Sequence, residues 1–487
     1  MLSLGGLLGA SLFADLVVCG GDAVLEGGSF LFIGRTASRH AGLTVVFSIG
    51  LAGLGMSLVA LCYSEMTAMF TRAVSPYKAA GVAWGRFFAW LLGWILILEY
   101  MSGAMALAIG WSAMFQALFR NLCMTIPPQW ATSPFSMARL SDGRLVAGFL
   151  NFPAMLIVLP LSAMLLVGIK GASNLNVALV GTKISSLLIF LVAGLAYIKP
   201  ANWTPWVPKN MGSLGALGWS GATGGAGVVG FALLGFDSVA TLSSEAKNPA
   251  RDLPRAILGS LLMVMVLLVA VALVFTGLLP LHKLNSSDPM HTLLDEGTKL
   301  IWLEPYLQLG ALAGLGSFIT VLLISQSRLC LSLASDGLLW LSLGKLDKRF
   351  QAPHVAILAG GFLIALGAGI IPIHVVGRLA CAAVLCALAA ACATVLHLRY
   401  SRPDIHRPFR TPWVPLVPIL AVIVCISMAT LIPVATWRQL IAWVILGMAV
   451  YRLYGHQGHR RVVSPEAIPR RRANVDEAAD NNRRGDI

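Results

Sequence analysis

Residues 254–280 read PRAILGSLLMVMVLLVAVALVFTGLLP, and Arg255 is the only charged residue among them. A helix of about 20 apolar residues matches the hydrocarbon layer of a bilayer, which is about 30 Å thick. Blocks of this kind recur along the whole chain. Twelve of them lie near residues 10–33, 41–71, 87–118, 145–168, 174–198, 222–243, 254–280, 306–335, 353–372, 376–398, 414–433 and 436–454. The sequence therefore predicts an all-α integral membrane protein with about twelve transmembrane helices.

The composition excludes a water-soluble protein. The 487 residues are 57% hydrophobic and 11% charged, with a mean hydropathy of +0.80, whereas soluble domains carry roughly a quarter charged residues. The net charge of +14 comes from Lys and Arg residues between the apolar blocks and in the C-terminal tail. This distribution indicates that the basic residues orient the chain and contact anionic membrane lipid, and no nucleic-acid partner is expected.

The basic residues also predict the orientation of the chain. An even number of spans places both termini on one side of the membrane. If that side is the cytoplasm, 23 of the 35 Lys and Arg residues lie in cytoplasmic segments and 11 on the opposite face. Because cytoplasmic loops carry an excess of Lys and Arg, we predict cytoplasmic termini, with the plasma membrane as the location.

Glycines interrupt the first and the sixth apolar block. The first contains Gly20, Gly21, Gly27 and Gly28 around Glu26. The sixth contains a run of glycines that ends in Gly235-Phe236-Asp237. Non-helical backbone at membrane depth survives only where it lines a cavity or is buried in protein. Interruptions five helices apart predict inverted repeats with a binding site near the bilayer midplane. The alternative is that the glycines only allow helices to pack closely.

Several short stretches of the chain occur in a characteristic order. They are Cys62-Tyr63-Ser64-Glu65, Ile95-Leu96-Ile97-Leu98-Glu99-Tyr100, Ala201-Asn202-Trp203-Thr204-Pro205, Gly235-Phe236-Asp237, SEAKNPARDLPRAI at 244–257, Ser327-Arg328, Asp336-Gly337-Leu338-Leu339 and RPFRTPWVPLVP at 407–418. From about Asp15 to Tyr454 the chain thus resembles the cationic amino acid transporters of the amino acid/polyamine/organocation (APC) superfamily.

This resemblance implies the leucine-transporter-like fold, with two five-helix inverted repeats followed by two peripheral helices. The expected division is a short N-terminal segment, a first repeat of spans one to five, an outer loop, a second repeat of spans six to ten, spans eleven and twelve, and a disordered cytoplasmic tail. The corresponding ranges are 1–9, 10–198, 199–221, 222–398, 399–454 and 455–487.

The resemblance also implies where the substrate binds. In such proteins, exposed backbone amides of span one hold the substrate carboxylate, and carbonyl oxygens of spans one and six meet its amino group. The corresponding residues here are Ala23, Leu25, Glu26, Gly27 and Gly28 in span one, and Phe231, Ala232 and Leu234 in span six. The family position of Phe231 implies an aromatic gate, the alternative being ordinary packing. The family pattern is close to G-A-I-I-G-T-G-I-F, and Glu26 departs from it by replacing a glycine, which leaves the substrate open.

Ionisable residues within the apolar blocks are functional candidates, because they are costly at membrane depth. Lys183 matches a lysine of span five that occupies a sodium position in sodium-independent relatives, and the resemblance implies a role in proton coupling. A purely structural lysine is the alternative. Glu99 could relay protons or brace the helices. Glu26 and Lys183 could also form a pair. Ser102 and Ser325 are candidates for the substrate pathway.

The function expected from these features is secondary-active or facilitative transport of amino acids by alternating access. The expected substrates are cationic amino acids (arginine, lysine, ornithine) or small neutral ones. A transport-inactive amino acid sensor on the same scaffold is the alternative, motivated by Glu26. An ion channel is disfavoured because the blocks show no continuous polar stripe. The sequence contains no nucleotide-binding loop, metal cluster or nucleophile–base set, so we expect neither enzymatic activity nor a cofactor or metal. It does not fix the oligomeric state.

Overall fold

The computed structural model describes residues 42–70, 75–124, 126–139, 144–167, 169–204, 206–207, 218–237, 248–280, 289–298, 300–345, 347 and 353–455. Its α-helices are α3 (Val45–Met69), α4 (Ser75–Trp84), α5 (Arg86–Asn121), α6 (Phe152–Val167), α7 (Ile169–Leu195), α8 (Gly218–Ala232), α9 (Pro249–Leu278), α10 (Pro289–Thr292), α11 (Glu304–Ser335), α12 (His354–Ile370), α13 (Ile373–Ser401), α14 (Leu416–Ala429) and α15 (Val434–Val450). Short 3-10 or π helices are η2 (Gly42–Thr44), η3 (Pro128–Trp130), η4 (Pro200–Trp203), η7 (Leu293–Thr298), η8 (Ile301–Leu303), η9 (Leu341–Gly344) and η10 (Tyr451–Gly455). The strands β1 (Met137–Arg139) and β2 (Leu145–Ala147) form an antiparallel hairpin.

The positions of the helices agree with the predicted apolar blocks. Helices occupy eleven of the twelve blocks, while the first block, 10–33, lies outside the described residues. Within the described part of the chain, seven helices are long and apolar enough to cross a membrane, and three shorter apolar helices accompany them. The all-α membrane architecture is therefore confirmed.

The fourth block begins later than predicted. Residues 145–147 form strand β2 rather than the start of a helix, and α6 begins only at Phe152. The reason is local, because the Asn151 side chain accepts a hydrogen bond from the backbone N–H of Ala154 (3.3 Å). Asn is a preferred N-cap residue, and Pro153 fits the first turn, where its missing N–H is not needed.

The sixth block contains the interruption that its glycines predict. Helix α8 ends at Ala232, in the middle of the block, and the chain turns through Leu233–Gly235. Gly235 has φ +113°, a conformation that a residue with a Cβ rarely adopts. The matching interruption predicted in the first block lies outside the described residues.

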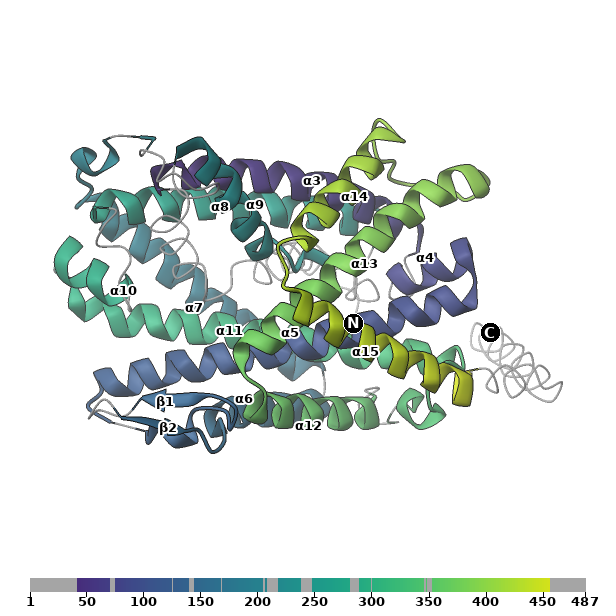
Figure 1. The fold of residues 1–487 in the computed structure, drawn as a ribbon, viewed down its shortest axis with the longest axis horizontal. Helices are drawn as coiled ribbons and strands as arrows, with labels where there is room; N and C mark the ends of the chain where they lie inside the picture. The colour runs from purple at the N-terminus through teal and green to yellow at the C-terminus, as the bar shows by residue number, and fades with distance from the viewer. Residues whose placement is uncertain are drawn as a thin grey trace, which may run out of the picture.

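The long helices pack in pairs (Figure 1). α3 lies against α9, α5 against α11, and α6 against α12. In addition, α7 packs on α11, and α13 packs on α5. The pair α6 and α12 forms the lower edge of the view in Figure 1, together with the hairpin.

The buried hydrophobic side chains form two separate clusters. The first unites α3, α8 and α9 and includes Ile49, Val229 and Val264. The second unites α4, α5, α6, α11 and α12 and includes Trp90 and Ile319. Helices α4, α5, α11 and α13 contribute buried side chains to both clusters, for example Leu98 of α5 and Leu307 of α11 to the first. The two clusters thus share helices, and polar residues lie where they meet, as described below.

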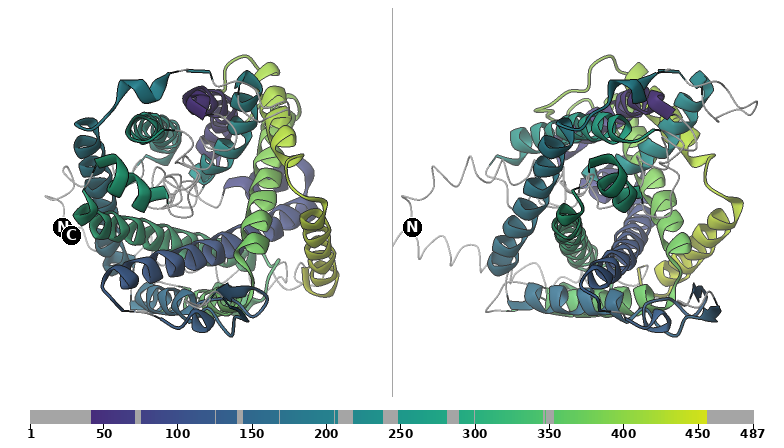
Figure 2. Two further views of the ribbon diagram at one scale, coloured as in Figure 1. Left: turned by 60° about the vertical axis from the view of Figure 1, so that its left-hand side comes forward. Right: turned by 90° about the vertical axis from the view of Figure 1, so that its left-hand side faces the viewer.

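Helices α14 and α15 lie on the outside of the molecule (Figure 2). Two tryptophans fasten α15 to α5. Trp94 Nε1 donates to the Trp443 carbonyl (2.9 Å), and Trp443 Nε1 donates to the Trp94 carbonyl (3.0 Å). The two rings stack with centroids 4.7 Å apart. Because each indole satisfies a backbone group of the other helix, α15 is held in one rotational position.

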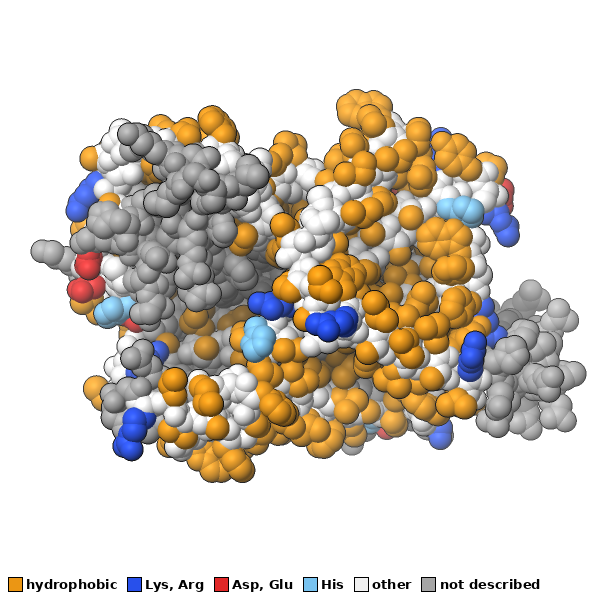
Figure 3. All heavy atoms as spheres, viewed as in Figure 1, with side chains coloured by type: hydrophobic (Ala, Val, Ile, Leu, Met, Phe, Trp, Pro, Cys, Tyr) orange, Lys and Arg blue, Asp and Glu red, His pale blue; other side chains and the backbone are white. Residues whose placement is uncertain are grey.

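The outer surface of the peripheral helices is apolar. Figure 3 shows hydrophobic side chains over α13, α14 and α15, with basic side chains near the ends of these helices. Exposed apolar side chains include Ile423, Ile441 and Ile445. A surface of this kind is stable when lipid rather than water covers it.

Candidate functional site

A cluster of polar side chains lies where the two groups of helices meet. Glu99 and Tyr100 come from α5, Tyr63 comes from α3, and Asp237 follows the end of α8. All four are buried, with at most 7% of the side chain exposed. Tyr63 donates a hydrogen bond to the backbone carbonyl of Asp237 (3.4 Å). The ring of Phe236 meets that of Tyr63 edge-on, with centroids 6.0 Å apart.

The carboxyl groups of Glu99 and Asp237 interact directly. Their side chains are joined by a hydrogen bond. An ionised carboxylate is only an acceptor, so two carboxyl groups can share a hydrogen bond only when one of them carries a proton. Two carboxyl groups this close can share a proton, and the pair connects α5 with the end of α8.

Two polar atoms of this cluster lack an internal partner. Glu99 Oε2 and the Tyr100 hydroxyl are buried and have no hydrogen-bond partner among the described residues. A buried polar atom without a partner costs about 1–3 kcal/mol, so native proteins rarely keep one without a reason. Both atoms are thus positioned to interact with water, a proton or a bound solute.

Lys183 lies between α7 and α11. Its side chain is 8% exposed and runs along Gly314 of α11. A Cβ atom at Gly314 would stand 2.7 Å from Lys183 Cδ and 3.2 Å from Lys183 Nζ. One turn away, Gly310 receives the side chain of Ser186 in the same manner. The two glycines therefore give α11 a groove that accepts the lysine.

A third contact lies along the same interface between α7 and α11. The Ser317 hydroxyl donates to the Oδ1 atom of Asn176 (2.6 Å). Positions 176, 183 and 186 of α7 thus face positions 317, 314 and 310 of α11 in antiparallel order. Lys183 stands in a row of polar residues rather than alone in an apolar interface.

The other predicted site residues fall into two groups. Ala23, Leu25, Glu26, Gly27 and Gly28 lie outside the described residues, and so does the Glu26–Lys183 pair. In span six, Phe231 is half-buried and packs against the first cluster, Ala232 is the last residue of α8, and Leu234 is buried in the turn after it.

The two serines proposed for the pathway are both buried. The Ser102 hydroxyl donates to the Leu98 carbonyl (2.6 Å), and the Ser325 hydroxyl donates to the Val321 carbonyl (2.8 Å). Each hydroxyl proton is therefore used within its own helix, which leaves the oxygen lone pairs to accept other hydrogen bonds.

Three residues of the cluster received no role from the sequence. Tyr63, Tyr100 and Asp237 all stand in the motifs quoted above, but only the fold brings them together. A usable signal was present for Asp237, since it is an ionisable residue directly after a glycine-interrupted apolar block.

A further buried carboxylate lies near the C-terminal end of α3, two residues after Tyr63. Glu65 is fully buried and accepts two hydrogen bonds from Arg399, with Nε at 2.8 Å from Oε1 and NH2 at 2.7 Å from Oε2. The backbone N–H of Thr411 donates to Oε2 as well (2.8 Å). This ion pair fastens the end of α3 to the end of α13 and to the segment before α14. It satisfies its own charges and therefore has a structural role.

A further set of contacts holds α4 to the C-terminal end of α11. Tyr77 and Lys78 both donate to the Asp336 carboxylate. The Tyr77 hydroxyl also contacts Ser332 (2.6 Å). Burial raises the pKa of Tyr77, so this hydroxyl keeps its proton and remains a donor. Among the described residues, no group of three or more His, Cys, Asp or Glu side chains could hold a metal ion.

Ionisable side chains buried among membrane-spanning helices, beside a helix that ends within its apolar block, are features of a transmembrane carrier. The model of the amino acid permease family matches residues 11–450. The chain therefore belongs to the amino acid permease family of the APC superfamily, as its motifs predicted. It is a multi-pass membrane protein with the all-α fold of that superfamily, and it acts in amino acid transport rather than in catalysis.

Relatives with known names cover most of the chain. It is 33% identical over 446 residues to the methylthioribose transporter of Bacillus subtilis, covering 91% of this chain and 92% of that protein. It is 31% identical over 444 residues to a branched-chain amino acid permease of the same organism, with 91% and 92% covered. It is 30% identical over 393 residues to the vacuolar cationic amino acid transporter 4 of Arabidopsis thaliana, covering 80% of this chain and 63% of that one.

Proposed function

We propose that this chain is a proton-coupled carrier of amino acids that works by alternating access. Its substrate site lies between spans one and six, its termini are cytoplasmic, and it resides in the plasma membrane. The observation that carries the proposal is the hydrogen-bonded pair Glu99–Asp237, because this pair links a proton to the end of the interrupted helix beside the site.

The packing of the helices supports the two inverted repeats. A repeat of five spans relates α3 to α9, α5 to α11, α6 to α12 and α7 to α13. If the two repeats are exchanged, each helix takes the place of its counterpart, so the pairs α3–α9, α5–α11 and α6–α12 stay the same. The pair α7–α11 maps onto α13–α5, and both contacts occur. This agreement favours repeats over spans one to five (10–198) and six to ten (222–398), with α14 and α15 as additions.

The two apolar clusters support alternating access. Helices α3, α8 and α9 contribute only to the first cluster and α6 and α12 only to the second, so a displacement of one set against the other would change contacts mainly where the clusters meet. The polar contact Glu99–Asp237 connects α5 with the end of α8. Such contacts can be exchanged for contacts with water or solute at low cost, which buried apolar packing cannot.

The substrate that we favour is an amino acid with a neutral, apolar side chain. The span-six side of the proposed site offers Phe231, Leu234 and the backbone after Ala232, beside Ala23, Leu25, Glu26, Gly27 and Gly28 from span one. Two of the relatives with nearly complete coverage are named for neutral solutes. Cationic amino acids are the second candidate, because the carboxyl groups of Glu99 and Asp237 would attract a second ammonium group.

Uptake into proteoliposomes tests the function. We expect saturable uptake of radiolabelled leucine or isoleucine that increases with an inward proton gradient. Competition with alanine, arginine, lysine and methylthioribose at several pH values then orders the substrates. Strong competition by arginine but not by leucine would establish the cationic substrate. A substrate-dependent thermal shift without any flux would instead support the transport-inactive sensor.

Replacing Glu99 with glutamine should separate coupling from binding. The amide can still donate to Asp237, so the shape of the site is kept, but residue 99 can no longer exchange a proton. We expect gradient-driven uptake to fall by about fivefold or more, since coupling between two ligands is typically worth about 5- to 150-fold. Exchange of labelled for unlabelled substrate at equal pH should continue. The measurement is uptake against pH for both modes.

The matched control is Glu304→Gln. Glu304 is also a buried glutamate, 4% exposed, but it lies at the far end of α11 and is hydrogen-bonded to Asn121, Gln308 and His291. Its pH profile should equal that of the wild type. An unchanged profile in Glu99→Gln itself would assign Glu99 to structural bracing.

A further inference from the structure

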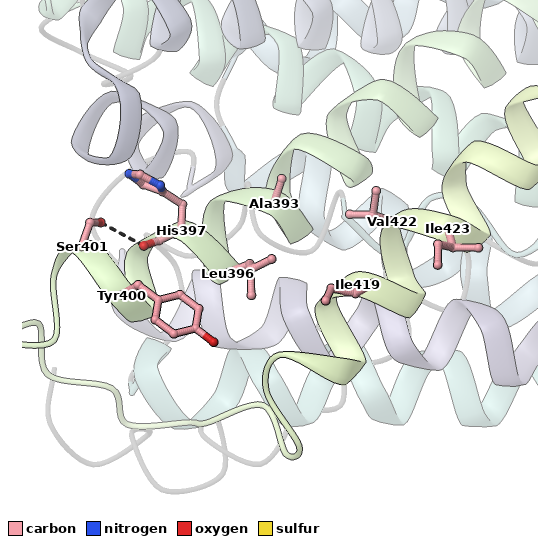
Figure 4. Close-up of a pocket in the computed structure, with 8 residues that line it drawn as sticks. All are labelled: Ala393, Leu396, His397, Tyr400, Ser401, Ile419, Val422 and Ile423. Atoms are coloured by element: carbon pink, nitrogen blue, oxygen red, sulfur yellow. Dashed lines mark hydrogen bonds between the residues drawn. The ribbon is translucent and has the colours of Figure 1, made fainter.

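A groove lies on the outer surface of the protein between α13 and α14 (Figure 4). Its volume is about 700 Å³. Leu396 of α13 faces Ile419 of α14 across it, and Val422 and Ile423 extend its apolar wall. Ile419 and Ile423 are 43% and 54% exposed, so the wall is open to the bilayer.

The groove changes from apolar to polar along its length. His397, Tyr400 and Ser401 line the end that adjoins the segment connecting the two helices, whereas aliphatic residues line the rest. From position 393 to position 401 a helix rises about 12 Å. This length is close to the hydrocarbon half of one leaflet, about 15 Å. A lipid chain lying along this length would bring its headgroup to the polar end of the groove.

The segment beyond the polar end is basic and rigid. Arg402 and Arg410 are exposed, and Asp404 is the only acidic residue from 399 to 418. The guanidinium of Arg407 fixes the backbone by donating to the carbonyls of Leu398, Arg402 and Ile405, at 2.8–2.9 Å. The two exposed arginines are thus presented on a backbone that is already ordered.

Exposed aromatic side chains flank the two arginines in the sequence. Tyr400 is 70% exposed and Trp413 is 79% exposed. Tyrosine and tryptophan are enriched at membrane–water interfaces, where one end of the ring system is apolar and the other is wet. These residue types are therefore those expected beside lipid headgroups.

We propose that this groove binds one anionic phospholipid, with its phosphate between Arg402 and Arg410 and an acyl chain between α13 and α14. The apolar wall fits a hydrocarbon chain. The two guanidinium groups complement the phosphate of a lipid whose remaining headgroup is uncharged or anionic. A zwitterionic lipid carries a cationic group that would meet the same arginines. The site therefore selects by headgroup charge, independently of the transported substrate.

Native mass spectrometry of the full chain tests the site. The protein in mild detergent is supplied with equal amounts of dioleoyl phosphatidylglycerol and dioleoyl phosphatidylcholine. Each arginine near an anionic headgroup favours binding by about fivefold. The Asp404 carboxylate offsets part of the attraction of the two arginines. We therefore expect the first bound lipid to be phosphatidylglycerol, with a preference of about tenfold over phosphatidylcholine. Increasing the salt concentration should reduce this preference.

Two variants and one control locate the lipid. Arg402→Gln with Arg410→Gln should bring the preference close to one, and Ala393→Phe, which fills the groove, should reduce binding of both lipids. The control is Arg378→Gln combined with Arg438→Gln. These two exposed arginines lie near the N-terminal ends of α13 and α15, away from the polar end of the groove, so this variant should keep the wild-type preference.

Three results would overturn the proposal. They are a wild-type preference near one, a preference that the arginine variants leave unchanged, and binding that Ala393→Phe does not reduce. A dimer that Ala393→Phe dissociates, without any change in lipid binding, would assign the groove to a second copy of the chain.

Discussion

Lys183→Gln should abolish accumulation of substrate driven by a proton gradient while leaving a folded protein. The glutamine fits the space beside Gly314 and can form hydrogen bonds, but it cannot take up or release a proton. We expect gradient-driven uptake to fall by about tenfold or more, within the range of about 5- to 150-fold that is typical for coupling between two ligands. Residual exchange should no longer depend on pH. Uptake in proteoliposomes between pH 5 and 8 measures both effects.

The control for this experiment is Lys199→Gln. Lys199 lies just beyond the end of the same helix, and its side chain is exposed. Its removal changes the charge equally but leaves the interface between α7 and α11 intact, so wild-type uptake is expected. If Lys183→Gln retained full gradient-driven uptake, the lysine would have only a structural role. Gly314→Ala offers a second test, because it crowds the lysine without changing its charge.

Glu65→Ala should strongly destabilise the protein at the C-terminal end of α3. It leaves Arg399 without its bidentate partner and removes the acceptor of the Thr411 N–H. Breaking a buried ion pair typically costs about 3–5 kcal/mol. Arg399 is 22% exposed, so we expect the lower end, about 3 kcal/mol. The measurement is thermal unfolding in detergent, monitored as the loss of the monodisperse fraction.

A double-mutant cycle isolates the pair. Glu65→Ala combined with Arg399→Met should be more stable than the sum of the single losses predicts, because Arg399 no longer remains as an unpaired charge. Arg407, which lies 3.5 Å from Glu65, is unchanged in both backgrounds. Asp404→Asn is the control, since Asp404 is an exposed carboxylate in the segment after α13, and its change should stay within about 0.5 kcal/mol. Equal stability of Glu65→Ala and Asp404→Asn would rule out an anchoring role for Glu65.

The sequence was sufficient to place the helices, because apolar length is a local property. Each block such as 254–280 specifies its own span without reference to the rest of the chain. The start of α6 was wrong for a local reason as well, since the cap at Asn151 competes with the apolar pattern of residues 145–150. The short helix α4 was not predicted at all. It is a ten-residue helix bounded at its end by Gly85 with φ +90°, too short to show as an apolar block.

The candidate site was predicted only in part. Lys183 and Glu99 could be identified because ionisable residues at membrane depth are rare, whatever surrounds them. The partners of these residues are far away in sequence, and nothing in the composition of α11 singles out Gly314 as the contact of Lys183. The same holds for the pairing of Glu99 with Asp237 and of Glu65 with Arg399. Such contacts arise from the packing of helices and not from the pattern within one helix. The role of the span-one residues stays a prediction.

The stacked indoles of Trp94 and Trp443 have a practical consequence for following the motion of this carrier. Since each ring is bonded to the backbone of the neighbouring helix, α15 cannot slide or turn relative to α5 without breaking two hydrogen bonds. A probe attached to the lipid-facing side of α15 therefore reports the position of α5. Distances measured from such a fixed reference to a second probe on α9 would record displacement of α9 relative to α5.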